Sequence, residues 1–168
     1  MPDNLQVLRL APEIVLSVCG ALVMVLDAVL SERRKFWLTV LSLVGIYTAG
    51  VAALAGGANP GSAFGGMIRV DAFAGYFRLL VCGIGFLIIL GSMDYLERHH
   101  LLRGEYCALV LFSLTGQCLM AVSDELIMIF LGLEISSIST YVLAGFRRDD
   151  GNSSESALKY FFLGSFAT

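Results

Sequence analysis

The chain has 168 residues, of which 57% are hydrophobic and only 15% are charged. A soluble domain of this size usually carries about 25% charged residues. Here the apolar residues come in blocks of about 20, the length that a helix needs to cross a ~30 Å hydrocarbon core. The net charge of −3 is mild and argues nothing about nucleic acid, but the chain has no basic stripe, so we expect no nucleic acid partner. The composition therefore predicts a protein that crosses the membrane several times.

The apolar blocks predict an all-α, polytopic transmembrane helix bundle with five full spans and the start of a sixth. The expected full spans are about 11–30, 36–55, 72–93, 106–122 and 126–146, and the incomplete one covers 154–168. Half a transmembrane helix leaves carbonyl groups without partners in lipid. We therefore expect residues 1–168 to form a single transmembrane domain that is the N-terminal part of a longer protein.

Positively charged residues mark one side of the predicted bundle. Lysines and arginines are enriched in loops that face the cytoplasm. Two such residues fall on one side, Arg9 and Arg69, and seven fall in the alternate loops: Arg33, Arg34, Lys35, Arg98, Arg103, Arg147 and Arg148. This bias places the N-terminus outside and the Arg-rich loops in the cytoplasm.

One loop and one stripe of small residues each predict a local feature of the structure. The loop over 56–69, GGANPGSAFGGMIR, is rich in Gly, Pro and Ser and predicts a flexible external connector. In the second span, Gly45, Ala49 and Ala53 recur every four residues, a stripe of small residues that lets another helix approach closely. The stripe predicts helix packing and no particular chemistry.

The sequence offers no residues for redox or metal chemistry. All four cysteines, Cys19, Cys82, Cys107 and Cys118, lie inside apolar blocks and form no CxxC pair, so we interpret them as packing residues. There is no phosphate-binding loop and no dinucleotide fingerprint. We expect no metal site, no catalytic residue and no cofactor bound by this chain.

Glu134 is the residue of greatest interest, because it falls near the middle of the fifth span. A carboxylate at that depth is costly unless it is paired, protonated or hydrated, so we expect it to face a partner or a cavity. Ser137 and Tyr141 follow on the same helical face and could hydrogen-bond the carboxylate or hold water for proton transfer. The alternative is a structural glutamate that stabilises the bundle.

Lys159 stands one turn into the sixth span, four residues after Glu155, a spacing that favours an ion pair. On spacing alone, Lys159 is either a lysine that reaches the interface beside Glu155 or a buried ammonium that passes protons on. Asn152 with Glu155 resembles a capping box at the helix start. Arg78 is expected to pair or to reach the outer interface.

The remaining acidic residues lie near the ends of the spans. Glu13 and Asp27 stand close to the two ends of the first span, and we expect both to be hydrated. Glu105 and Glu125 bound the fourth span and are expected at the membrane interface.

The segment 104–168 resembles the antiporter-like subunit N family of bacterial NADH-quinone oxidoreductase, or complex I. The matching features are the GEY start of span four, the LGLE-plus-serines core of span five, the YVLAGFRR exit, and the pattern S-E-x-A-L-K-Y-F-x-L-G-x-F-A in span six. The first three spans match in number and length, and in a D-x-F-x-x-x-F segment of span three.

The resemblance implies a non-redox subunit of a proton-translocating NADH:quinone oxidoreductase in the bacterial inner membrane. Glu134 would be the family's span-five glutamate, and Glu105, Glu155 and Lys159 would be further ionisable residues for proton transfer. The partners would be other membrane subunits and the lipid bilayer, while NADH, FMN, iron–sulfur clusters and quinone would bind elsewhere in the complex. Residues 1–168 alone are not expected to be active. The alternatives are a subunit of a multisubunit Na⁺/H⁺ antiporter or membrane-bound hydrogenase, and a structural or assembly helix bundle.

Overall fold

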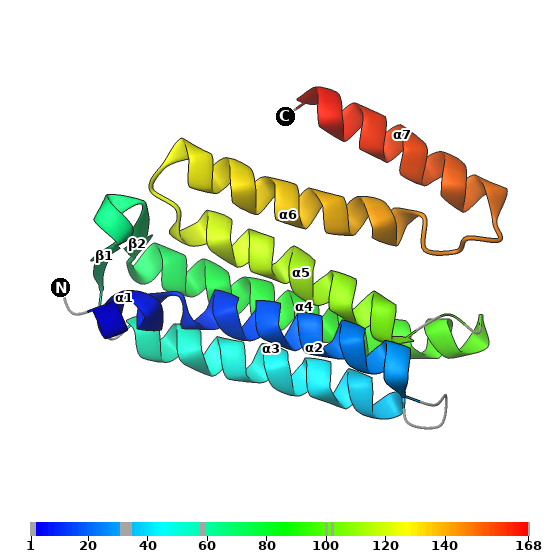
Figure 1. The fold of residues 1–168 in the computed structure, drawn as a ribbon, viewed down its shortest axis with the longest axis horizontal. Coiled ribbons are helices and arrows are strands. Elements are labelled where there is room, and N and C mark those ends of the chain that lie inside the picture. The colour runs from blue at the N-terminus through cyan, green and yellow to red at the C-terminus, as the bar shows by residue number, and fades with distance from the viewer. Residues whose placement is uncertain (1–2, 31–34, 58–59, 100, 102, 168) are drawn as a thin grey trace.

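A computed structural model describes residues 3–30, 35–57, 60–99, 101 and 103–167 (Figure 1). Its longer helices are α2 (Ala11–Val29), α3 (Phe36–Gly57), α4 (Ala72–Arg98), α5 (Arg103–Val122), α6 (Leu126–Ala144) and α7 (Gly151–Ala167). The short elements are α1 (Asp3–Arg9), β1 (Gly61–Ala63), the 3₁₀ turn η2 (Phe64–Gly66) and β2 (Ile68–Val70). Five helices of the described chain, α2 to α6, are long and apolar enough to cross a membrane. They confirm the predicted all-α bundle with five full spans.

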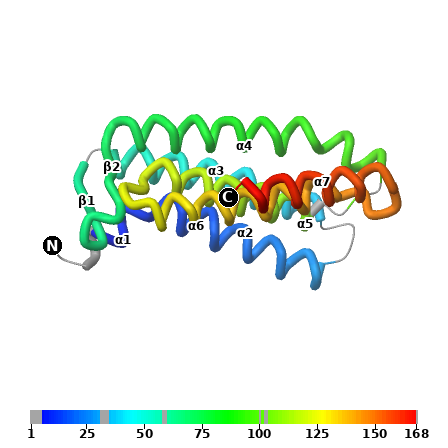
Figure 2. Tube along the Cα trace, turned by 90° about the horizontal axis from the view of Figure 1, so that it is seen from above, coloured from blue at the N-terminus to red at the C-terminus, as the bar shows by residue number. Residues whose placement is uncertain are grey.

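Helix α5 lies at the centre of the bundle and packs against α2, α3, α4 and α6. Figure 2 shows α4 along one side and α2 along the other, with α3, α5 and α6 between them. The last helix, α7, packs mainly on α6 and extends away from the other helices (Figure 1). The core therefore belongs to α2–α5, while α6 and α7 form one flank.

Small residues allow these helices to approach closely. Gly45 lies against the Cys19 side chain, and Ala49 and Ala53 are buried beside it, which confirms the predicted packing stripe. Between α5 and α6, a Cβ on Gly116 would collide with the backbone of α6 at Gly132. The contact between α5 and α6 is thus made in part by backbone against backbone.

Two helix boundaries differ from the sequence prediction. Helix α4 continues five residues past the expected end at Met93, and Arg98 pairs with Asp94 at 2.7 Å in this last part. Helix α7 begins at Gly151 rather than near Ser154. The Asp150 carboxylate accepts a hydrogen bond from the backbone N–H of Asn152. Asp150 therefore caps the start of α7, a role that the sequence had suggested for Asn152.

The loop before α4 contains a hairpin that its composition did not predict. Within it, β1 and β2 pair as an antiparallel hairpin, with Gly61 opposite Val70. Positive φ angles at Gly65 (68°) and Gly66 (98°) make the tight turn possible, because glycine adopts them without steric cost. Gly65 and Gly66 are therefore required by the turn of this hairpin.

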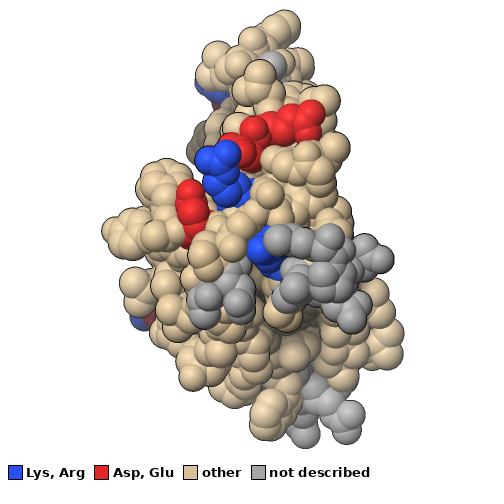
Figure 3. Space-filling view, turned by 90° about the vertical axis from the view of Figure 1, so that its left-hand side faces the viewer, with Lys and Arg blue, Asp and Glu red and all other residues tan. Residues whose placement is uncertain are grey.

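The hairpin contacts two segments that are far from it in the sequence. The Arg9 guanidinium donates hydrogen bonds to the carbonyls of Pro60 and Ser62. On the other side, Arg69 pairs with Asp124 at 2.7 Å in the turn between α5 and α6. Figure 3 looks onto this end of the molecule, where acidic and basic side chains lie close together on a largely uncharged face.

Candidate functional site

Glu134 lies in the middle of α6, on the face turned away from α5. The residues of α6 buried in the bundle are Gly132, Ser136 and Ser139. Two residues along a helix correspond to a rotation of about 200°, so Glu134 points to the opposite side. Within the described chain, the half-buried carboxylate has neither a hydrogen-bond nor an ion-pair partner. Glu134 therefore faces away from the core of α2–α5, and the expectation that it faces a partner or a cavity stays a prediction.

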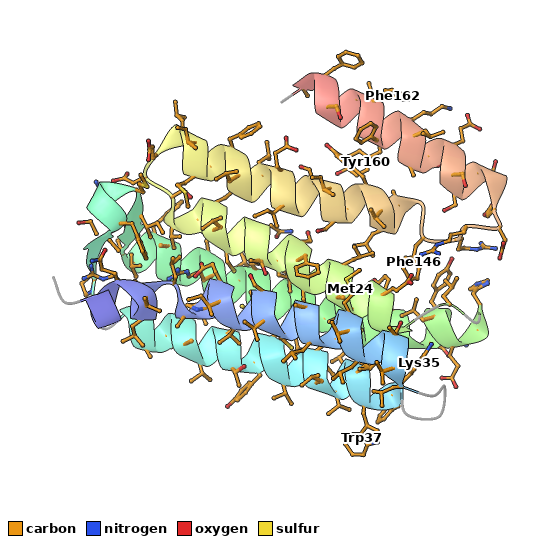
Figure 4. All side chains as sticks on the ribbon, in the orientation of Figure 1. Met24, Lys35, Trp37, Phe146, Tyr160 and Phe162 are labelled. Atoms are coloured by element: carbon orange, nitrogen blue, oxygen red, sulfur yellow. The ribbon has the colours of Figure 1, made fainter. Side chains whose placement is uncertain are left out.

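The face that carries Glu134 is the one on which α7 packs. Tyr141, seven residues further along α6, stacks edge to face with Tyr160 at a ring separation of 4.8 Å. Its hydroxyl also lies against Gly164. Figure 4 shows Tyr160 between α7 and α6. Ser137 and Tyr141 share this face, as predicted, but neither is hydrogen-bonded to Glu134 in the described chain.

Lys159 and Glu155 form the predicted i,i+4 ion pair at 2.5 Å. Their side chains are 70% and 61% exposed, so the pair points away from α6. Tyr160, the residue after Lys159, contacts Tyr141, which lies seven residues, or about 10 Å, along α6 from Glu134. The structure therefore brings Lys159 together with Glu155 and not with Glu134.

Glu105 occupies a third, separate place. It pairs with Arg148 at 2.8 Å and thereby links the start of α5 to the segment that follows α6. Its side chain is half-buried and that of Arg148 is exposed, as expected at a membrane interface. The four residues predicted to transfer protons thus lie at three separate places. Glu134 is in the middle of α6, Glu155 and Lys159 are paired on α7, and Glu105 is at the start of α5.

Sequence reasoning missed a buried ion pair between α2 and α4. Arg78 donates from Nε to Glu13 Oε1 at 2.8 Å and from Nη2 to Glu13 Oε2 at 2.7 Å. It also donates to the carbonyl of Arg9 at 2.9 Å. Arg78 is fully buried, so it pairs instead of reaching the interface. Glu13 is also buried, which differs from the expectation that it is hydrated. Glu13 and Arg78 both lie near the start of spans that run in the same direction, and this similar depth could have indicated the pair.

A second buried pair lies at the opposite end of α2. The Lys35 ammonium is 3.7 Å from Asp27 Oδ1, and both side chains are about one-tenth exposed or less. Figure 4 shows Lys35 where α2 and α3 meet, while the nearby Trp37 projects outward. The expectation that Asp27 is hydrated at the surface is wrong. Arg33 and Arg34, which contributed to the predicted topology, lie outside the described residues.

Polar side chains also meet inside the bundle between α5 and α6. The Gln117 amide donates to Ser113 Oγ at 3.2 Å, and Ser113 and Ser136 are hydrogen-bonded at 3.1 Å. Ser113 and Gln117 line a groove of about 410 Å³ between α4, α5 and α6, together with Tyr106 and Thr140. In an apolar membrane bundle such hydroxyl and amide contacts join helices.

Comparison with known proteins agrees with this class of fold, a polytopic membrane helix bundle. A chain of respiratory complex I from Thermus thermophilus with bound aureothin superposes with a TM-score of 0.76 at 28% identity. The match covers 93% of this chain and 33% of that chain. Residues 123–168 match the family described as NADH:quinone oxidoreductase/Mrp antiporter, TM.

Curated relatives extend the similarity to most of the sequence. NADH-quinone oxidoreductase subunit N 1 of Solibacter usitatus is 51% identical over 161 residues, which cover 96% of this chain and 33% of the relative. Subunit N of Trichlorobacter lovleyi is 41% identical and covers 98% of this chain and 34% of the relative. Over nearly all of its length, the chain is therefore similar to curated NADH-quinone oxidoreductase N subunits. It spans about one-third of the length of the curated relatives that it matches.

Proposed function

We propose that this chain is part of a proton-translocating membrane subunit of respiratory NADH:quinone oxidoreductase. The observation that carries the proposal is Glu134. This carboxylate lies half-buried in the middle of a membrane-spanning helix, without a partner in the described chain, inside the segment matched by the family. An ionisable group at that depth is costly, and it usually serves ion or proton transfer.

The residues of this chain would act through the placement of charge. Glu134 is positioned to attract a proton or a cationic side chain on the face that α1–α5 leave open. Lys159 and Glu155 form an adjustable pair on α7, because breaking an exposed ion pair costs little. A change in one of these charges alters the proton affinity of its neighbours, which is the physical basis of coupling between sites.

Energy and redox chemistry would come from outside this chain. NADH oxidation and quinone reduction would take place at cofactors held by other subunits, and this chain would be a non-redox component of the translocase. Its partners would be other membrane subunits of the complex and the lipid bilayer. The family description also includes Mrp antiporters, which makes cation/proton antiport the second candidate. The relatives' names favour the oxidoreductase.

A chimera tests the proposed function. Residues 1–168 would replace the matching third of subunit N in a bacterium whose complex I can be purified. We expect the complex to assemble and to retain at least about half of its NADH-driven proton pumping, since homologous bundles tolerate sequence change when volume and pattern are kept. Assembly accompanied by a complete loss of pumping would argue for a purely structural role.

We also propose that the N-terminus and the hairpin lie outside, with the Arg-rich loops in the cytoplasm. Single cysteines at Met67 in the hairpin, at His99 after α4 and at Asn152 at the start of α7 would be introduced after the four native cysteines are replaced by Ala. All three positions are exposed. We expect an impermeant maleimide added to intact cells to label only the Met67 variant, by about tenfold over the others. Labelling of the other two alone would reverse the topology.

A further inference from the structure

The four cysteines are not equivalent in the structure, although the sequence predicts a packing role for each. All four are buried and free. The thiols of Cys82 on α4 and Cys118 on α5 are hydrogen-bonded to each other. Cys107 is instead hydrogen-bonded to hydroxyls of α3, and Cys19 donates to the carbonyl of Leu41. The described chain therefore holds two thiols in direct contact and two whose hydrogen bonds go to other groups.

The packing of α4 on α5 holds the two thiols together. These helices are consecutive spans, and Gly85 lies so close to the Leu114 side chain that a Cβ on Gly85 would collide with it. Cys82 stands three residues before Gly85, and Cys118 stands four residues after Leu114. In antiparallel helices both steps lead about one turn in the same direction. Cys82 and Cys118 thus form the next layer of the same close interface.

An apolar groove leads from the surface of the bundle to Cys82. It has a volume of about 240 Å³ and lies between α3 and α4, with Cys82, Gly50 and Tyr47 among its lining residues. Tyr47 is 68% exposed, so the groove opens outward. Gly50 lies opposite Cys82, because a Cβ on Gly50 would be 4.0 Å from the Cys82 Cβ. In a membrane-spanning bundle, such a groove admits molecules that dissolve in hydrocarbon.

We propose that Cys82 and Cys118 form a redox-sensitive dithiol, which a lipid-soluble organic hydroperoxide converts into a disulfide between α4 and α5. The hydroperoxide reaches Cys82 through the groove, and the Cys82 thiolate attacks it. The O–O bond breaks, an alcohol leaves with the thiol proton, and Cys82 becomes a sulfenic acid. The Cys118 sulfur then attacks the Cys82 sulfur, the S–S bond forms, and water leaves. Two thiols and one hydroperoxide give one disulfide, one alcohol and one water.

Differential labelling of the full-length subunit in the assembled complex tests the proposal. Membranes are treated with cumene hydroperoxide and denatured, and the remaining thiols are blocked with iodoacetamide. Disulfides are then reduced, and the released thiols are labelled with N-ethylmaleimide. We expect mass spectrometry to find this second label equally on Cys82 and Cys118, at least about fivefold above Cys19 and Cys107, because a sulfenic acid in the pair has a thiol partner. A pair labelled no more than Cys19 and Cys107, or labelled on one member alone, would overturn the proposal.

Three substitutions separate the thiol pair from its access route. Cys82→Ala should remove the second label from Cys118, which then has no partner. Gly50→Leu fills the groove in front of Cys82 and should slow the oxidation several-fold. Gly91→Leu is the matched control, because it makes the same change on α4 outside the groove, where a Cβ meets no neighbour. It should leave the rate unchanged. Labelling of Cys118 without Cys82, or a rate that Gly50→Leu does not lower, would refute the inference.

Discussion

Replacing Arg78 by Met is expected to destabilise the full-length subunit by about 3–5 kcal/mol, the cost of removing one partner of a buried ion pair. The substitution leaves the Glu13 carboxylate, 5% exposed, without its bidentate partner in the bundle. It also removes the hydrogen bond to the Arg9 carbonyl that ties the turn between α1 and α2 to α4. The loss should be measured as a lower midpoint of unfolding in detergent, followed by circular dichroism.

Two further variants separate the unpaired charge from the loss of packing. The double variant Glu13→Leu with Arg78→Met leaves no charge unpaired, so it should cost less than Arg78→Met alone. Arg98→Met breaks an ion pair of the same length, 2.7 Å, on the same helix, but with both side chains about three-quarters exposed. It should change stability by less than about 1 kcal/mol. Equal effects of Arg78→Met and Arg98→Met would contradict the assignment of a buried pair.

The sequence predicts the membrane helices well because hydrophobic length is a local property. Each full span needs about 20 apolar residues, and α2, α3 and α6 end within a few residues of the expected positions. The error at α4 has a simple cause. Asp94 and Arg98 look like a loop by charge, yet their i,i+4 spacing suits a helix that continues beyond the apolar block.

The hairpin and the buried ion pairs could not be predicted in the same way, because they depend on contacts between distant segments. Glycines at 61, 65 and 66 favour a flexible loop by composition, but Arg9 and Asp124, far away in sequence, fix the segment as a hairpin. Glu13 and Asp27 stand at helix ends, where hydration is the usual outcome. Their partners, Arg78 and Lys35, become visible only when the helices are placed side by side.

The candidate site was predicted correctly where it is local. The Lys159–Glu155 pair follows from spacing along one helix, and the structure contains it. The side of α6 on which Glu134 lies could not be predicted from the sequence, because it depends on which helices surround α6. In this chain, α5 covers one face of α6 and α7 covers part of the other. The role of the four ionisable residues in proton transfer stays a prediction.

Glu134→Gln is expected to lower coupled quinone reduction and proton pumping by about tenfold or more, because it removes ionisation while keeping shape and hydrogen bonding. Glu134→Asp keeps a carboxylate one methylene further back and should retain part of both activities. Asp94→Asn, an equivalent loss of charge at an exposed position of α4, is the control and should be silent. Normal assembly of all three variants must be verified on native gels.

The decisive measurement is the rate of NADH-driven proton translocation by complex I reconstituted in proteoliposomes, with full-length subunit N carrying this segment and each Glu134 variant. If Glu134 takes part in proton transfer, the Gln variant assembles but pumps slowly, and the Asp variant lies between it and the wild type. A Gln variant that assembles and pumps at the wild-type rate would contradict the proposal and leave Glu134 with a structural role alone.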